Sequence, residues 1–143
     1  MSLNNPQLDL NNQLCFPLYA ASRKIVNAYT PYLKELDLTY TEYLVFLVLW
    51  EKDNIKVGDI CDRLFLDNGT ITPLLKKLEN KKLIERTRSK EDERKVTISL
   101  TQKGIELEDK VKDIPQKLAG CFKIDEKEAL SLYTTLYKIL NEN

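Results

Sequence analysis

The hydrophobic pattern of the chain changes period near residue 83, and this change restricts the folds that the chain can adopt. Before that point, apolar residues recur every three or four positions, as they do in amphipathic helices. The stretches "LIERTRS" and "RKVTISL" then alternate apolar and polar residues on either side of "KEDE", which predicts a two-stranded hairpin. The helical pattern returns after Thr101. We therefore expect a mainly α-helical chain with one small β-hairpin, in the α+β class.

Capping residues predict where most of the helices begin. Ser, Thr, Asp and Asn at a helix start bond the free backbone N–H groups, and an acid three residues later completes a capping box. The helix "EYLVFLVLWEK" is apolar nearly all round and should be the most buried element. The expected helices are 11–36 with a regular part that begins close to Cys15, 42–52 capped by Thr41, 56–66, 68–82 capped by Asp67, 102–120 capped by Thr101, and one that starts at the Asp125–Glu128 capping box and ends near Asn141.

The order of these elements predicts a winged helix-turn-helix. Two short helices joined by a turn and followed directly by a hairpin have this arrangement, with the second helix for recognition and the hairpin as the wing. A chain of 143 residues suits a single domain, 1–143, in which residues 41–100 form the winged part. The segments 1–36 and 102–143 carry more apolar surface than such a part requires. We expect them to form the dimerisation region of a homodimer.

Charge is balanced overall but concentrated locally. The chain has 22 basic and 22 acidic residues, yet nine basic and five acidic residues lie between Lys76 and Lys95. A basic segment on an otherwise acidic chain is typical of a protein that contacts phosphates, although a solvated charged face has the same composition. Together with the predicted dimer, it indicates double-stranded DNA with a pseudo-palindromic operator. The residues expected to face DNA are Thr70, Thr72, Lys76 and Lys77 on the recognition helix, and Arg86, Arg88, Arg94 and Lys95 on the wing.

The composition argues against several other classes of protein. The absence of histidine excludes Cys-His and Ser-His-Asp catalysis and a histidine zinc site, and there is no glycine-rich phosphate loop. We expect no enzyme activity, no cofactor and no metal. No apolar run is long enough to span a bilayer and no secretory signal is visible, which predicts a cytoplasmic protein without a membrane partner.

Three cysteines, an odd number, do not form the disulfide framework of a secreted protein. Cys15 lies at the start of a predicted helix, where the helix dipole favours a thiolate, and Phe16 and Tyr19 offer apolar surface nearby. The alternative is that Cys15 fills a core, as most free cysteines do. Cys61 occupies an apolar position inside a helix, and we expect it to be core filler. Cys121 follows Gly120 in the loop before the last helix.

Two stretches resemble a known family. "LDNGTITPLLKKLENKKLIERTRSKEDERKVTISLTQKG" is similar to the central signature of the MarR family of transcriptional regulators, with Asp-x-Arg at Asp92 and Arg94. "QLCFPLYAASR" resembles the N-terminal motif of its OhrR-like subgroup, the organic-hydroperoxide-sensing repressors. The resemblance extends from about residue 11 to the C-terminus.

This resemblance implies specific roles for the cysteines and tyrosines. Cys15 matches the peroxide-sensing cysteine, Tyr29 and Tyr40 match tyrosines that bond its sulfur across the dimer, and Tyr19 matches another tyrosine near it. Some members carry a second cysteine near position 121 that forms an intersubunit disulfide with the sensor, whereas others form mixed disulfides with small thiols. Cys121 is therefore a candidate resolving cysteine.

The resemblance also implies a DNA-contacting set. Asp92 matches an aspartate that orients the arginine at 94 into the minor groove. Two positions depart from the subgroup: Asn68 stands where serine is usual, and Pro17 where alanine is commoner. The matching positions of the recognition helix are Asn68, Thr70, Thr72, Pro73 and Lys77.

The function expected from this reading is a redox-sensing repressor that releases its operator when an organic hydroperoxide oxidises Cys15. Three alternatives stay open. A MarR-type regulator released by a small aromatic ligand would leave Cys15 incidental. A broader redox regulator of virulence or metabolism would sense several oxidants, and a thiol peroxidase would also place a reactive cysteine at a helix start.

Overall fold

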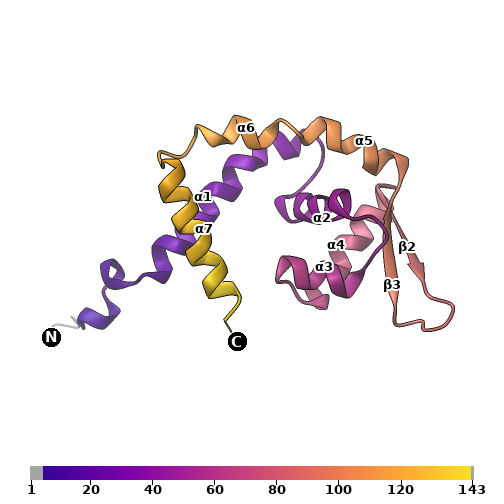
Figure 1. Ribbon diagram of the computed structural model, residues 1–143, viewed down its shortest axis with the longest axis horizontal. Coiled ribbons are helices and arrows are strands. Elements are labelled where there is room, and N and C mark those ends of the chain that lie inside the picture. The colour runs from indigo at the N-terminus through magenta and orange to yellow at the C-terminus, as the bar shows by residue number, and fades with distance from the viewer. Residues whose placement is uncertain (1–4, 143) are drawn as a thin grey trace. The chain divides into compact units, whose positions relative to one another are not determined.

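The chain divides after Tyr40 into two compact units, Met1–Tyr40 and Thr41–Asn143. The computed structural model describes residues 5–142. The elements in chain order are η1 (Pro6–Leu8), η2 (Leu10–Asn12), α1 (Cys15–Lys34), α2 (Tyr40–Glu51), β1 (Ile55–Lys56), α3 (Val57–Leu64), α4 (Asn68–Asn80), β2 (Ile84–Arg88), β3 (Val96–Leu100), α5 (Gln102–Val111), α6 (Ile114–Ala119) and α7 (Glu126–Leu140). Figure 1 labels the α-helices and the strands β2 and β3. Within residues 5–142, none of the helices is both long and apolar enough to cross a bilayer.

Helix α1 begins at Cys15, as its sequence predicts. The residues before it form two 3-10 turns, η1 and η2, in which the side chains of Asn5 and Asp9 accept hydrogen bonds from backbone N–H groups two residues later. Leu14 precedes α1 and provides no side-chain cap. The N–H groups of the first turn of α1 are therefore left open to other partners.

Helix α2 carries the largest share of the core, which confirms the prediction from its apolar sequence. Half of its twelve residues are buried, including Phe46 and Leu49 with no exposed surface. The helix begins at Tyr40, so the prediction of Thr41 as N-cap is wrong, and Thr41 lies in the first turn. Glu42 is also buried, and its carboxylate pairs with Lys81 Nζ at 3.2 Å. This ion pair joins α2 to the residue that follows α4.

A tight turn connects α3 to α4. Phe65 ends α3 in the left-handed conformation with φ of 55°, a geometry that lets its N–H bond back to carbonyl groups of α3. Asp67 then caps α4, as expected, by accepting from the N–H of Thr70 at 2.8 Å. Ile71, Leu75 and Leu78 are buried along one side of α4. Leu74 on the same helix is only half-buried.

The wing hairpin forms where the alternating pattern predicts it. Strands β2 and β3 pair antiparallel, with Arg88 opposite Val96 near the tip of the hairpin. A third strand, β1, pairs with the other edge of β3 and gives the sheet order β1-β3-β2. Strand β1 was not predicted, because its two residues are too few to show an alternation.

The segment after the wing forms three helices rather than the expected two. Thr101 caps α5 by accepting from the N–H of Gly104 at 3.1 Å, as predicted. The prediction of one helix over 102–120 is wrong, because the helix ends at Val111 and Pro115 lies in the first turn of α6, where its missing N–H is tolerated. The capping box of Asp125 and Glu128 starts α7, as predicted.

Gly104 allows α5 to approach the strand connection closely. A Cβ atom at this position would lie 2.2 Å from the carbonyl oxygen of Leu83. The carbonyl of Gly104 also accepts a hydrogen bond from Trp50 Nε1 at 3.0 Å. These contacts fix the start of α5 against α2 and against the residue that precedes β2.

Candidate nucleic-acid interface and cysteine sites

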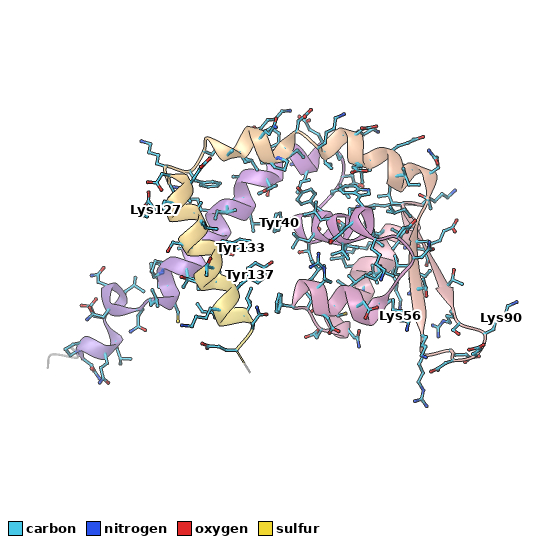
Figure 2. All side chains as sticks on the ribbon, in the orientation of Figure 1. Tyr40, Lys56, Lys90, Lys127, Tyr133 and Tyr137 are labelled. Carbon is cyan, nitrogen blue, oxygen red and sulfur yellow. The ribbon has the colours of Figure 1, made fainter. Side chains whose placement is uncertain are left out.

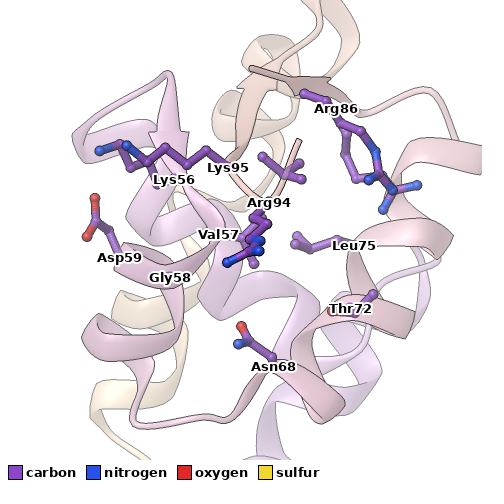
Figure 3. Close-up of a pocket in the computed structure, with 12 residues that line it drawn as sticks. Lys56, Val57, Gly58, Asp59, Asn68, Thr72, Leu75, Arg86, Arg94 and Lys95 are labelled. Carbon is purple, nitrogen blue, oxygen red and sulfur yellow. The ribbon is translucent and has the colours of Figure 1, made fainter. Parts of the chain in front are cut away.

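A basic cavity of about 430 Å³ lies between the start of α3, the helix α4 and the wing. Its lining includes five basic side chains and one acid, Asp59. Figure 3 shows Arg94 and Arg86 reaching toward the cavity from the wing, with Asn68 and Thr72 on α4 at its other side. The predicted site residues that the structure brings together here are Asn68, Thr72, Arg86, Arg88, Arg94 and Lys95.

The other four predicted positions on α4 do not line this cavity. They are exposed on the same helix: Thr70, Pro73, Lys76 and Lys77. Conversely, Lys56 lines the cavity and was not predicted. Lys56 lies beside the wing because it pairs with Thr97 in β1, a strand too short to be predicted from the sequence.

The arginines on β2 are partly engaged with the protein itself. Arg86 Nη2 pairs with Glu79 Oε1 at 3.2 Å, and the Arg86 side chain is 25% exposed. Its Nε is buried and has no hydrogen-bond partner in the described part of the chain. Arg88 Nη1 donates to the backbone carbonyl of Glu93 at 3.4 Å. Arg86 therefore joins α4 to the wing, while Arg88 stabilises the hairpin tip.

Asp92 shapes the tip of the wing through the backbone. Its Oδ1 accepts from the backbone N–H of Arg94 at 3.0 Å, and its carbonyl oxygen accepts from the N–H of Lys95 at 3.0 Å. The N–H of Ser89 bonds the carbonyl of Lys95 at 2.9 Å and closes the loop. The loop therefore holds Arg94 and Lys95 on exposed positions beside the cavity.

Two carboxylates near this face have lowered pKa values. The pKa of Glu79 is lowered mainly because its carboxylate accepts a hydrogen bond from Arg86. The pKa of Asp67 is lowered mainly because its carboxylate accepts from the backbone N–H of Thr70. Both groups are ionised at neutral pH. Asp67 caps the start of α4, and Glu79 joins the end of α4 to Arg86 in the wing.

Cys15 is the exposed first residue of α1. Phe16 and Tyr19 beside it are also exposed, and the guanidinium of Arg23 lies 5.5 Å from the centre of the Tyr19 ring. A thiol in this place is open to small molecules and has apolar and aromatic surface next to it.

Tyr29 and Tyr40 form an aromatic pair at the far end of α1. Their ring centres are 5.0 Å apart, and burial, with a smaller contribution from Tyr29, raises the pKa of Tyr40. Fourteen residues of helix separate Tyr29 from Cys15, which is roughly 20 Å at the helical rise. Within one chain, Tyr29 therefore does not reach the Cys15 sulfur, so the implied contact requires a second chain.

The two remaining cysteines have opposite environments. Cys121 is exposed in the loop after α6, where its Sγ lies 3.8 Å from the carbonyl of Lys117. Cys61 is buried, as expected of core filler, but its thiol also donates a hydrogen bond to Asn68 Oδ1 at 3.3 Å, which was not predicted. No cluster of metal-binding side chains occurs among residues 5–142.

The terminal segments expose many large apolar side chains. On α7, the rings of Tyr133 and Tyr137 are in contact in a tilted arrangement with their centres 4.7 Å apart, and Figure 2 labels both on this helix. The exposed apolar residues are Leu8, Leu10, Leu14, Phe16, Leu18, Tyr19 and Ile25 in the first unit, and Leu130, Leu132, Tyr133, Tyr137, Ile139 and Leu140 on α7.

The known proteins that the chain resembles are transcriptional regulators. Residues 27–111 match the family "Transcriptional regulator SarA/Rot". The chain is 45% identical over 133 residues to the organic hydroperoxide resistance transcriptional regulator of Bacillus subtilis strain 168, covering 93% of this chain and 90% of that protein.

Two solved structures of AbfR, a protein of Staphylococcus epidermidis, resemble the chain along nearly its whole length. The reduced form bound to DNA has a TM-score of 0.76 at 32% identity and covers 96% of this chain and all of that one. The disulfide form has a TM-score of 0.66 at 32% identity and covers 95% and 96%. The expected fold, mainly α with a winged helix-turn-helix, is thereby confirmed.

Proposed function

Because the chain belongs to the SarA/Rot family of transcriptional regulators, and more broadly to the MarR-type winged-helix regulators, we propose that it is a thiol-switched repressor. It binds double-stranded DNA as a homodimer and releases its operator when an organic hydroperoxide oxidises Cys15. This regulator acts in the cytoplasm and uses neither a cofactor nor a metal.

The basic cavity between α4 and the wing carries the DNA-binding part of this proposal. Its five basic side chains face a space bordered by the first turns of a helix, the part of a recognition helix that approaches base edges. Arg94, exposed at the tip of the wing, enters the minor groove, while Lys76 and Lys77 on the outer side of α4 contact phosphates. The AbfR structure bound to DNA has this fold and supports the same arrangement.

The exposed apolar residues of α1 and α7 support a homodimer. Side chains such as Leu130 and Tyr133 are 68% and 60% exposed in the single chain, which a second copy would cover. A two-fold dimer reads a pseudo-palindromic operator with its two recognition helices. The dimer also brings the Tyr29–Tyr40 pair of one chain to the Cys15 of the other.

The chemistry of the switch uses the exposed thiol. The Cys15 thiolate attacks the outer oxygen of the hydroperoxide, the O–O bond breaks, and the alcohol leaves with the proton that the thiol gave up. Sulfur loses two electrons and becomes a sulfenic acid. The thiol of Cys121 from the other subunit then attacks that sulfur, and a disulfide forms as water leaves. The solved disulfide form of AbfR supports such a step.

The thiol reacts once per cycle and is not an enzyme active site. Arg23, two turns along α1 from Cys15, lies over the Tyr19 ring. A thiol peroxidase needs a base or an arginine next to its cysteine. Turnover of many peroxide equivalents per Cys15 with dithiothreitol would contradict this part of the proposal.

Fluorescence anisotropy on the labelled DNA upstream of the protein's own coding region tests the proposal. The reduced protein should bind this DNA, one equivalent of cumene hydroperoxide should abolish binding, and dithiothreitol should restore it. Cys15→Ser should bind equally well and ignore the peroxide. Cys121→Ser should still be released but form no disulfide-linked dimer on a nonreducing gel.

Each failure has a distinct meaning. If peroxide also releases Cys15→Ser, then Cys15 is not the sensor. If the wild-type protein binds DNA but ignores peroxide and responds to a small aromatic acid, the ligand-controlled regulator replaces the redox switch. Absence of any binding to DNA contradicts the assignment of the basic face.

A further inference from the structure

The two helices of the helix-turn-helix are joined by a side-chain bond between Cys61 and Asn68. The Cys61 thiol donates to Asn68 Oδ1 with an Sγ–Oδ1 distance of 3.3 Å, and Cys61 is only 7% exposed. The carbonyl of Cys61 also accepts from the N–H of Leu66 at 3.0 Å. Cys61 is therefore fixed to the turn by its backbone and to the first residue of α4 by its side chain.

The environment of Cys61 keeps its sulfur in the form that can donate. Burial raises the pKa of the Cys61 thiol, and the nearby carboxylates of Asp62 and Asp67 raise it further. A neutral thiol retains its S–H, whereas a thiolate would repel the amide oxygen. The low reactivity of a buried neutral thiol also separates Cys61 from the exposed Cys15.

The bond determines which end of the Asn68 amide faces outward. An asparagine side chain has one oxygen that accepts and one nitrogen that donates two hydrogens. The oxygen of Asn68 is turned toward Cys61, and Asn68 lines the basic cavity with Thr72, one turn further along α4. Figure 3 shows Asn68 at the head of α4, below Arg94. The Nδ2 hydrogens are thus the part of the amide that is free to meet a ligand in the cavity.

We propose that Cys61 is a positioning residue that presents Asn68 to DNA as a hydrogen-bond donor, and that Asn68 thereby selects an acceptor atom on a base edge. This inference rests on the proposed DNA binding. The expected partner of Asn68 is a base rather than a phosphate. Asn68 is the first residue of the recognition helix, and five basic side chains that line the cavity are available to the phosphates. The bidentate contact to adenine uses both the oxygen and the nitrogen of one amide, and the Cys61 thiol already occupies one lone pair of the Asn68 oxygen.

Four variants of the full-length reduced protein test the proposal on the protein's own upstream DNA and on unrelated DNA of equal length. Asn68→Ala should weaken binding to the upstream DNA about tenfold, or ~1.4 kcal/mol. Cys61→Val, which keeps an apolar side chain but loses the donor, should weaken binding to the upstream DNA by a smaller factor, roughly fivefold. Cys61→Ser, which keeps a donor, should restore most of that loss. The double variant Cys61→Val/Asn68→Ala should be no weaker than Asn68→Ala, because the two residues act as one unit.

Affinity for the unrelated DNA should change less than twofold in all four variants, because a base contact contributes little there. Wild-type affinity of Cys61→Val for the upstream DNA would overturn the proposal. So would an equal loss on both DNAs, or losses that multiply in the double variant. If the wild-type protein binds neither DNA, the proposed function itself fails. If the wild-type protein binds the upstream DNA and Cys61→Val binds it equally well, only the role of Cys61 fails.

A spectroscopic measurement keeps the proposal testable if Cys61→Val does not fold. In the Cys15→Ser/Cys121→Ser background, Cys61 is the only thiol, so its S–H stretch is the only one in the Raman spectrum. Asn68→Ala in that background should raise the frequency of the stretch, because the S–H loses its acceptor. An unchanged frequency would show that the bond is absent in solution and would overturn the proposal.

Discussion

The winged part of the chain and its terminal helices have similar apolar content but place their apolar side chains differently. Helix α2 buries six of its twelve residues, whereas α7 buries none of its fifteen. Trp50 of the winged part also donates a hydrogen bond to the carbonyl of Gly104, which holds the start of α5 against this core. The comparison indicates that the winged part is stabilised by its own core, and that α7 depends on a second chain for the burial that a single chain does not provide.

The largest expected effect comes from making the same substitution in both regions. Ile98→Ala in β3, where Ile98 is fully buried, should lower the free energy of unfolding by about 2–5 kcal/mol. The loss should not depend on protein concentration. Ile139→Ala on α7, where Ile139 is 51% exposed, should lower stability only at concentrations that support the dimer. Urea unfolding at two protein concentrations checks both, and a concentration-independent loss for Ile139→Ala would contradict the comparison.

The second prediction separates the two faces of α7. Leu130→Glu/Tyr133→Glu places charges on the apolar side of the helix and should dissociate the dimer, since each charge would be buried without a partner. Because two half-sites would no longer be bound together, the affinity for DNA should fall about a hundredfold. Sedimentation measures the dissociation. Ser131→Glu, on the opposite polar side, is the matched control and should remain dimeric.

The third prediction leaves the dimer intact and weakens only the winged part. Arg94→Ala should cost ~1–3 kcal/mol of DNA binding if its guanidinium occupies the minor groove. Because Arg94 is exposed and Asp92 bonds only its backbone N–H, the fold should be unaffected. Anisotropy on the upstream DNA measures the loss, and unchanged affinity would mean that the wing does not contact DNA.

The sequence predicted the regular elements better than the places where they meet. Capping residues such as Asp67, Thr101 and Asp125 fixed helix starts because their bonds reach only three residues ahead. Strand β1 was missed because two residues carry no periodicity, and with it the place of Lys56 in the cavity. The Cys61–Asn68 bond was missed because it depends on a left-handed residue in the turn, a geometry that the residue types there do not indicate.

A fourth, smaller effect should come from the ion pair that joins α4 to the wing. Since the pKa of Glu79 is lowered from its ordinary value of 4.5, its pairing with Arg86 stabilises the folded state above that pH. That stability is lost as the pH falls through the lowered pKa of the folded state. The Glu79 side chain is 37% exposed, so water screens the pair and the contribution is at most about 1 kcal/mol.

Comparison with Glu79→Gln isolates this contribution. The wild-type protein should unfold at a higher urea concentration than the variant at pH 7, and the difference should disappear below the lowered pKa. A difference that persists unchanged in acid would show that the side chain stabilises the protein through packing rather than charge.

The smallest expected effect is a change in the salt dependence of DNA binding when Lys77 is replaced, with the fold and the dimer left intact. Lys77 is exposed on the outer side of α4, and as a phosphate contact it displaces about one counterion from the DNA. Lys77→Ala should therefore reduce the slope of log affinity against log salt by about one unit. Lys127→Ala removes the same charge from the polar side of α7, and Figure 2 labels Lys127 on that helix. Equal slope changes in the two variants would mean that net charge alone, and not the winged face, governs binding, whereas a change confined to Lys77→Ala assigns the phosphate contacts to the winged part.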